Sequence, residues 1–228
     1  GISTSVIVKY SAAQDKILVN PLTIAQANIG ADTIFKDDHG FINGQKIFYD
    51  GNTTQATGLT TGTYFVYRIS DDAFQLGETR NDVVNEPPRV VGITTNTGGA
   101  DQQISLINPP LSVVNNNDLV FYVSDSSLNG YEFNFYYDKL FKNEFVSTGT
   151  TSGFTVEKVG TVGVGTTSTI TLKYHKDNPI NIYYAIEKSG FISTTDTDVQ
   201  NGSRIDYVDS VYNGTYTAFG VGSTSFNI

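Results

Sequence analysis

The sequence of 228 residues contains no methionine, no cysteine and no tryptophan. Without cysteine the chain has no disulfide framework, no thiolate nucleophile and no cysteine-ligated zinc or iron–sulfur site. A newly made chain begins with methionine, whereas this one begins Gly1-Ile2-Ser3. We therefore expect either a piece of a longer protein or a mature chain whose start was trimmed.

Positive charge is also scarce, because 14 Lys and Arg stand against 23 Asp and Glu and give a net charge of −9. Nucleic-acid binding depends on clustered Lys and Arg that contact phosphates, and the basic residues here are scattered. No apolar run approaches the roughly 20 residues of a membrane helix, and no basic-then-apolar signal segment begins the chain. We expect no nucleic-acid partner and no membrane insertion.

What remains favours a folded, β-rich protein, with 39% hydrophobic and 16% charged residues. Fourteen Phe and fourteen Tyr must fill the core together with Val, Ile and Leu. Aromatic and β-branched side chains suit a half-buried strand better than a helix. The length allows one large domain or two ordinary β domains.

Side chains alternate between apolar and polar in residues 131–138, 169–175 and 180–186. Such period-two patterns predict half-buried antiparallel strands. Residues 6–8, 64–69 and 119–123 are apolar at nearly every position, which predicts central strands covered on both faces. The best helix candidate is a short segment at 22–28 that follows Pro21.

Dipeptides that tolerate the positive φ of tight hairpins punctuate the chain. They are Asn43-Gly44, Asp50-Gly51, Asn129-Gly130, Asn201-Gly202 and Asn213-Gly214. The predicted fold class is all-β, built from antiparallel β-sandwich modules, immunoglobulin-like or similar, with two in tandem.

A weakly apolar stretch at 92–103 and a proline-containing break at 85–88 suggest where the modules divide. We predict an N-terminal β module at 1–98 and a C-terminal β-sandwich module at 99–228. One continuous sandwich is the alternative.

Residues 32–49, with the turn His39-Gly40-Phe41, together with 58–67 and 72–76, resemble a recurring module of virus tail proteins and bacterial surface proteins. Gly40 and Gly44 would bracket a tight reversal and Gly62 would permit a second one. The expected core contacts of this module are Ile47, Tyr49, Phe65, Tyr67, Phe74 and Leu76.

Residues 134–146, 153–167, 186–198, 207–216 and 220–226 resemble parts of the large multi-module structural proteins of cyanobacterial contractile-tailed phages. The resemblance implies a tail, baseplate or tail-fibre protein located in the virion. It further implies an oligomer that contacts sibling subunits and other virion proteins, with no catalysis and no cofactor.

Two alternative functions stay open from the residues themselves. A tail-associated glycan hydrolase would need two carboxylates that face each other across a groove. The candidate acids are Asp37, Asp38, Asp71, Asp72, Asp196 and Asp198, all of which could equally cap turns. His39 and His175 are the only histidines, and we assign them to a turn and to the solvent face of a strand.

Asp196, Asp198 and Asn201 place oxygen ligands ahead of a glycine and vaguely resemble a calcium loop. The twelfth position from Asp196 is Tyr207 and not the Glu that an EF-hand needs. A hairpin turn stabilised by these side chains is the competing interpretation.

Tyrosines are the residues best suited to recognition, since Tyr combines rigid apolar area with a polar tip. We select Tyr136, Tyr183 and Tyr212 as candidates for a receptor-binding or glycan-binding adhesin, whose ligand would be a host surface glycan. The same tyrosines could instead pack against a second sheet or a neighbouring subunit.

Overall fold

The computed structural model describes residues 3–11, 16–52, 55–94, 100–144, 153–176, 180–188 and 201–208. Strands dominate these residues, with a single α-helix and two short 3-10 turns among them, so the predicted all-β class is confirmed. The strands form one sheet of 11 strands, in the order β12-β13-β10-β1-β2-β8-β5-β6-β7-β4-β3, and one of four, in the order β11-β14-β15-β9.

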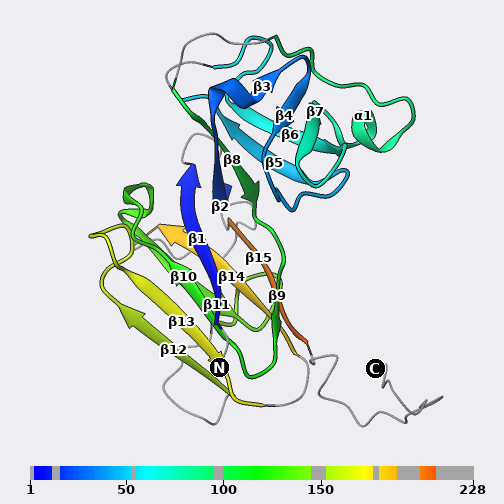
Figure 1. The fold of residues 1–228 in the computed structure, drawn as a ribbon. Helices are drawn as coiled ribbons and strands as arrows, with labels where there is room; N and C mark the ends of the chain where they lie inside the picture. Colours follow the sequence, from blue (N-terminus) through cyan, green and yellow to red (C-terminus); the bar gives the residue numbers. More distant parts are fainter. Residues whose placement is uncertain are drawn as a thin grey trace, which may run out of the picture.

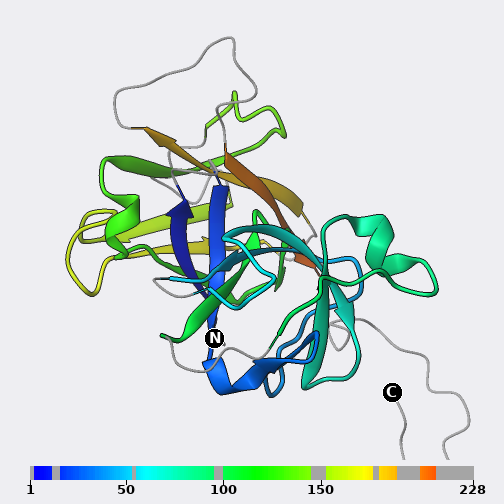
Figure 2. The ribbon, with the colours of Figure 1, turned by 90° about the horizontal axis from the view of Figure 1, so that it is seen from above.

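Two modules are visible in Figure 1, and the view from above in Figure 2 separates them as well. The insert module contains β3 (Ile29–Gly30), β4 (Thr33–Phe35), β5 (Lys46–Asp50), β6 (Gly62–Arg68), β7 (Ala73–Gly77) and α1 (Arg80–Val84). The base module contains β1 (Ser3–Ser11), β9 (Leu111–Val114), β10 (Asp118–Tyr122), β11 (Tyr131–Tyr136), β12 (Phe154–Val159), β13 (Thr169–Tyr174), β14 (Ile180–Lys188) and β15 (Asn201–Val208). Strands β2 (Lys16–Ile24) and β8 (Gln102–Ile107) run from one module into the other.

Each module has its own hydrophobic core. Val6, Val8, Ile17 and Val19 from the first two strands pack in the base module against residues of β9 to β15. The second core runs from Ile24 to Ile104 and fills the insert module. The predicted boundary between 98 and 99 falls outside the described residues and stays a prediction. Val6 and Val8 of β1 belong to the same hydrophobic core as the strands that follow residue 110.

The base module is sandwich-like, because side chains from the four-stranded sheet meet those of the large sheet. Phe133 of β11 lies 4.8 Å from Phe121 of β10 between ring centroids, and 5.8 Å from the stacked ring of Tyr184 on β14. The tandem arrangement and the immunoglobulin-like topology stay predictions.

Two ladders are parallel, contrary to the expectation of purely antiparallel sheets. β1 pairs with β10 and β15 pairs with β9 in parallel, whereas the other ladders are antiparallel. A parallel pair needs a long crossover connection. The whole insert module lies in the crossover from β1 to β10, so this pairing joins residues such as Ser3 and Asp118.

The alternating segments form strands as predicted, namely β11, β13 and β14. On β13 the side chains of Ile170, Leu172 and Tyr174 are buried, in agreement with the period of two. On β6 the predicted core residues were Phe65 and Tyr67, but the residues that belong to the core are Tyr64 and Val66, so the prediction was wrong by one position. A shift of one residue moves every side chain to the opposite face of a strand.

Helical structure differs from the prediction. Segment 22–28 continues β2 to Ile24 and then forms only the 3-10 turn η1 (Gln26–Asn28). The α-helix α1 was not predicted, although its start carries a sequence signal. Thr79 and Asp82 form a capping box, in which each side chain accepts a hydrogen bond from the main chain of the other.

One of the predicted turns is placed differently by the structure, and another lies outside the described residues. Asn201-Gly202 lies inside β15, where these residues pair with Ile186 and Ala185 of β14, so the turn prediction is wrong there. The dipeptide Asn213-Gly214 lies outside the described residues. At Gly40 and Gly44 the expected positive φ is present, with values of 69° and 74°.

Candidate functional site

His39 holds a turn of the insert module in place. Its buried ring accepts a hydrogen bond from the Phe41 N–H at Nδ1, 2.9 Å away, and donates one from Nε2 to the Ser70 carbonyl, 3.0 Å away. The ring packs edge-on against Phe74, with centroids 4.8 Å apart. Both ring nitrogens are therefore occupied by main-chain groups, and the arrangement explains the conformation of the His-Gly-Phe turn.

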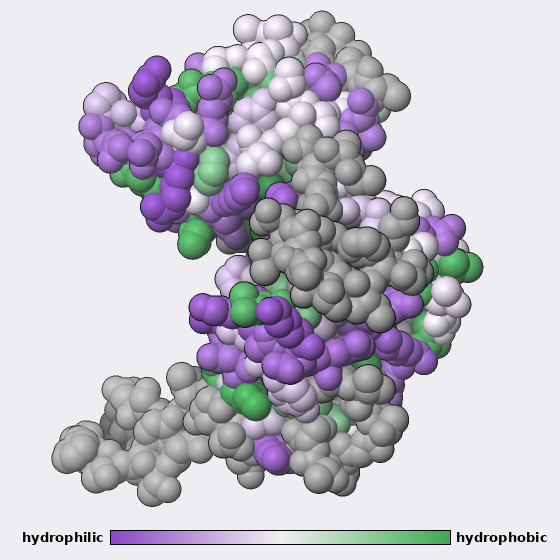
Figure 3. Space-filling view, turned by 180° about the vertical axis from the view of Figure 1, so that it is seen from behind, coloured by the Kyte–Doolittle hydropathy of each residue, from purple (hydrophilic) through white to green (hydrophobic). Residues whose placement is uncertain are grey.

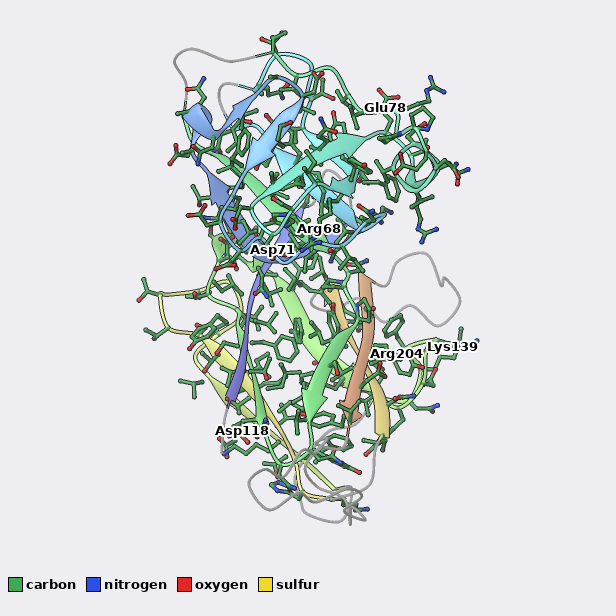
Figure 4. All side chains as sticks on the ribbon, turned by 45° about the vertical axis from the view of Figure 1, so that its right-hand side comes forward. Arg68, Asp71, Glu78, Asp118, Lys139 and Arg204 are labelled. Carbon is green, nitrogen blue, oxygen red and sulfur yellow. The ribbon has the colours of Figure 1, made fainter. Side chains whose placement is uncertain are left out.

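The acidic pairs of the insert module are tied into its loops. Asp72 Oδ1 accepts a hydrogen bond from the Asp38 N–H at 2.9 Å. Asp71 pairs with Arg68, and Figure 4 shows both residues at the end of the insert module that faces the base module. These contacts agree with turn capping, the competing interpretation, and show no groove-spanning dyad among Asp38, Asp71 and Asp72.

His175 is exposed at the end of β13. One ring nitrogen, Nε2, lies 2.8 Å from the Thr155 hydroxyl on β12. No carboxylate contact to this ring is present among the described residues. The environment fits the solvent-facing position that the alternating pattern predicts.

Tyr136 is buried rather than displayed. It is only 2% exposed, and its hydroxyl donates a hydrogen bond to the Glu187 carboxylate. Phe141 packs edge-on against Tyr136 at 5.5 Å and against half-buried Tyr183 at 6.3 Å. The structure thus places Tyr136 in side-chain packing, while Tyr212 lies outside the described residues.

Three glutamates gather beside Tyr136. Glu132 stands directly opposite Glu187 in the ladder of β11 and β14, and Glu144 forms a bridge with Tyr136. Burial raises the pKa of Glu144, and the carboxylates of Glu187 and Glu132 raise it further, partly opposed by Lys158. Burial and the hydrogen bond to Glu187 likewise raise the pKa of the Tyr136 hydroxyl.

A metal site is not evident in the part of the chain that the structure describes, because its His, Asp and Glu side chains form no group of three suited to holding an ion. Asp196 and Asp198 lie outside that part. Asn201 is the first residue of β15 and pairs with Ile186 of β14, and the hairpin interpretation of the residues before it stays untested. The calcium loop stays a prediction.

Two hollows open on the surface of the insert module. One, of about 390 Å³, lies beside α1 and is lined by Glu78, Asp82 and Arg89 together with main chain at Gly58 and Gly92. The Asp82 carboxylate is already engaged there, since it accepts hydrogen bonds from the N–H and hydroxyl of Thr79 at 2.9 and 2.6 Å. The other, of about 450 Å³, adjoins the His-Gly-Phe turn and includes Ile42.

The clearest candidate surface is an apolar row on the outer face of the large sheet, which we call the outer row. It consists of Ile7, Tyr122, Thr169 and Val159, which lie opposite one another on β1, β10, β13 and β12. Ile7, Tyr122 and Val159 are 48%, 43% and 60% exposed. The prediction that both faces of strands 6–8 and 119–123 are covered is therefore wrong within this structure.

Sequence reasoning missed the outer row because an apolar side chain on a strand does not reveal which sheet face is covered. The four strands that carry the row are neighbours in the large sheet, in the order β12-β13-β10-β1, and they lie side by side in the base module in Figure 1. Beside it, Lys173 and Glu157 form an ion pair at 2.9 Å. On the face of the molecule shown in Figure 3, by contrast, hydrophobic residues lie singly among polar ones.

No helix within the described ranges is long and apolar enough to cross a membrane. In comparisons with known proteins, no family model matches the sequence and no curated protein is significantly similar to it.

Proposed function

We propose that this chain is a non-enzymatic structural segment of a virus tail, baseplate or tail fibre. It acts through contacts with sibling subunits and other virion proteins, and its place is the virion. The resemblance of its sequence to phage structural proteins supports the proposal, and so does the outer row.

The outer row is the observation that carries the proposal. Single exposed hydrophobic side chains are common on protein surfaces, whereas a row in register across four strands offers a continuous apolar contact. Thr169 lies between Tyr122 and Val159 in the ladder and continues the row from β10 to β12. Burial of such a row against another protein removes apolar surface from water, which is the main favourable term in association.

Light scattering on size-exclusion fractions tests self-association through the outer row. The double variant Ile7→Thr, Tyr122→Thr keeps β-forming residues while it reduces the exposed apolar area at two of the three exposed hydrophobic positions of the row. We expect the parent to self-associate and the variant to do so about tenfold more weakly or less, which corresponds to about 1.4 kcal/mol. Val164→Thr is the matched control, because Val164 is 49% exposed and stands outside the row.

A parent that stays monomeric at every concentration, and that fails to bind the other proteins of purified particles, would contradict the proposal. Self-association that is equal in parent and double variant would remove the outer row as its cause.

A second candidate function is glycan binding by the loop after β11. Tyr137 and Leu140 are 44% and 46% exposed there. Asp138 fixes the loop, since its carboxylate accepts main-chain hydrogen bonds from Leu140 at 2.9 Å and Asn143 at 2.7 Å. A glycan array that shows reproducible binding by the parent and loss of binding by Tyr137→Ala would favour this function.

A further inference from the structure

The connection between the two modules is built from paired strands. Within the described residues, β2 and β8 pass from the base module into the insert module, and they pair with each other on both sides of the crossing. Their ladder is interrupted once, between Val19 and Leu22, where Asn20 and Pro21 stand opposite a single residue of β8. This is a β-bulge, a feature that bends a strand and increases its twist.

Asn20 occupies the bulge in a left-handed conformation, with φ of 48°. Its side-chain Oδ1 accepts a hydrogen bond from the Ile7 N–H of β1 at 2.9 Å. At this point β2 turns away from β1, so the Asn20 side chain takes the place of the main-chain partner that Ile7 loses. Pro21 follows and offers no N–H of its own.

Asn108 makes a matching contact where the chain leaves β8. It is also left-handed, with φ of 40°. Its N–H donates to the Ile17 carbonyl at 3.0 Å, while its Oδ1 accepts from the Ile17 N–H at 3.0 Å. The next residue is anchored to the base module, because the buried Tyr184 hydroxyl donates to the Pro109 carbonyl at 2.8 Å.

Side chains reinforce the same crossing. Leu106 of β8 packs against the core of the base module and against that of the insert module. Leu18, Phe48 and Ile107 form a small buried cluster of their own. In addition, Lys9 Nζ on β1 donates to Gln103 Oε1 on β8 at 3.1 Å.

We propose that Asn20 and Asn108 lock the crossing as a rigid joint, which fixes the angle between the two modules. The bulge sets the bend, and the side-chain oxygen of each asparagine accepts a hydrogen bond from a main-chain N–H of the base module. Without these acceptors the crossing would lose two hydrogen bonds that tie it to the base module, and it could relax toward other registers. The insert module then keeps one orientation relative to the base module.

Distance measurements between spin labels test the joint directly, and the absence of native cysteine allows labels at chosen sites only. Phe35→Cys on β4 of the insert module and Ser112→Cys on β9 of the base module replace exposed side chains on strands. Dilution with unlabelled protein removes distances between molecules. We expect a narrow distance distribution in the parent.

In this labelled background, Asn20→Ala and Asn108→Ala are expected to shift the distribution or widen it about twofold, as in the loosening of a hinge. Asn20→Gly accepts the left-handed φ and removes only the acceptor, so it tests the hydrogen bond even if Asn20→Ala folds poorly. Asn52→Ala is the control, since Asn52 also has a left-handed φ, of 52°, and its Nδ2 donates to the Asp101 carbonyl at 2.9 Å, a contact that involves neither Ile7 nor Ile17.

A broad distribution in the parent would overturn the proposal. An unchanged distribution in both Asn20→Gly and Asn108→Ala would overturn it as well, and so would an equal change in Asn52→Ala.

Discussion

Replacement of His39 by Ala removes the ring that holds the turn between Gly40 and Gly44, and the structure lets the cost be added up. The Phe41 N–H loses its acceptor in a buried position, at a cost of about 1–3 kcal/mol, and the Ser70 carbonyl loses its donor, at about 1 kcal/mol. Loss of the edge-on contact with Phe74 adds about 0.5–1.5 kcal/mol. These terms add up to about 2.5–5.5 kcal/mol, so we expect His39→Ala to lower the free energy of unfolding by about 4 kcal/mol.

Thermal unfolding followed by circular dichroism measures this effect, and tyrosine fluorescence supplies a second probe because the chain has no tryptophan. For a chain of this length the loss corresponds to a fall in Tm of roughly 10 °C. His175→Ala is the control, since its ring is exposed and hydrogen-bonds to a threonine hydroxyl, so that its loss should cost less than about 0.5 kcal/mol. If both variants unfold at the temperature of the parent, the structural role of His39 is refuted.

Two further predictions concern the base module. Because the folded-state pKa of Glu144 is raised by burial and by the carboxylates of Glu187 and Glu132, the folded state binds this proton more tightly than the unfolded state. The resulting stability is present below the ordinary pKa of Glu and is lost as pH rises through the raised value. Glu144→Gln should therefore stabilise the protein at neutral pH by about 0.5 kcal/mol and have no effect at low pH, which urea unfolding at several pH values would show; a loss at neutral pH would contradict it. Gly202→Ala should destabilise the protein by about 2–3 kcal/mol, because its Cβ would overlap the Tyr184 carbonyl, whereas the Cβ of Gly62→Ala makes an ordinary contact at 3.8 Å with the Thr60 carbonyl oxygen; equal denaturation midpoints for the two would refute this packing argument.

Local patterns predicted much of the strand structure, and particular residues show why. Ile170, Leu172 and Tyr174 alternate with polar residues, so the sequence alone identifies the buried face of β13. In the run that becomes β6 both faces are apolar or aromatic, and the sequence could not show that Tyr64 and Val66 are the buried pair. The face is decided by the register with β5 and β7.

The candidate site was predicted less well than the fold. Tyr136 was chosen as an exposed tyrosine, but packing of the loop residue Phe141 and a hydrogen bond to Glu187 bury it. Ile7 and Tyr122 were assigned to covered strands, yet no described element packs over them. Exposure of a side chain depends on what covers a sheet, and local sequence does not encode that cover.

The sequence by itself determined the all-β class, the alternating strands and the tight reversal at Gly40 and Gly44, because side-chain period and positive φ are local properties. Only the tertiary structure decided that β1 pairs with β10 in parallel and that the insert module interrupts the base module. Pairing between distant segments depends on loop closure and on the fit of whole hydrophobic faces, which no short window of sequence contains. The outer row and the joint at Asn20 and Asn108 arise from that long-range pairing.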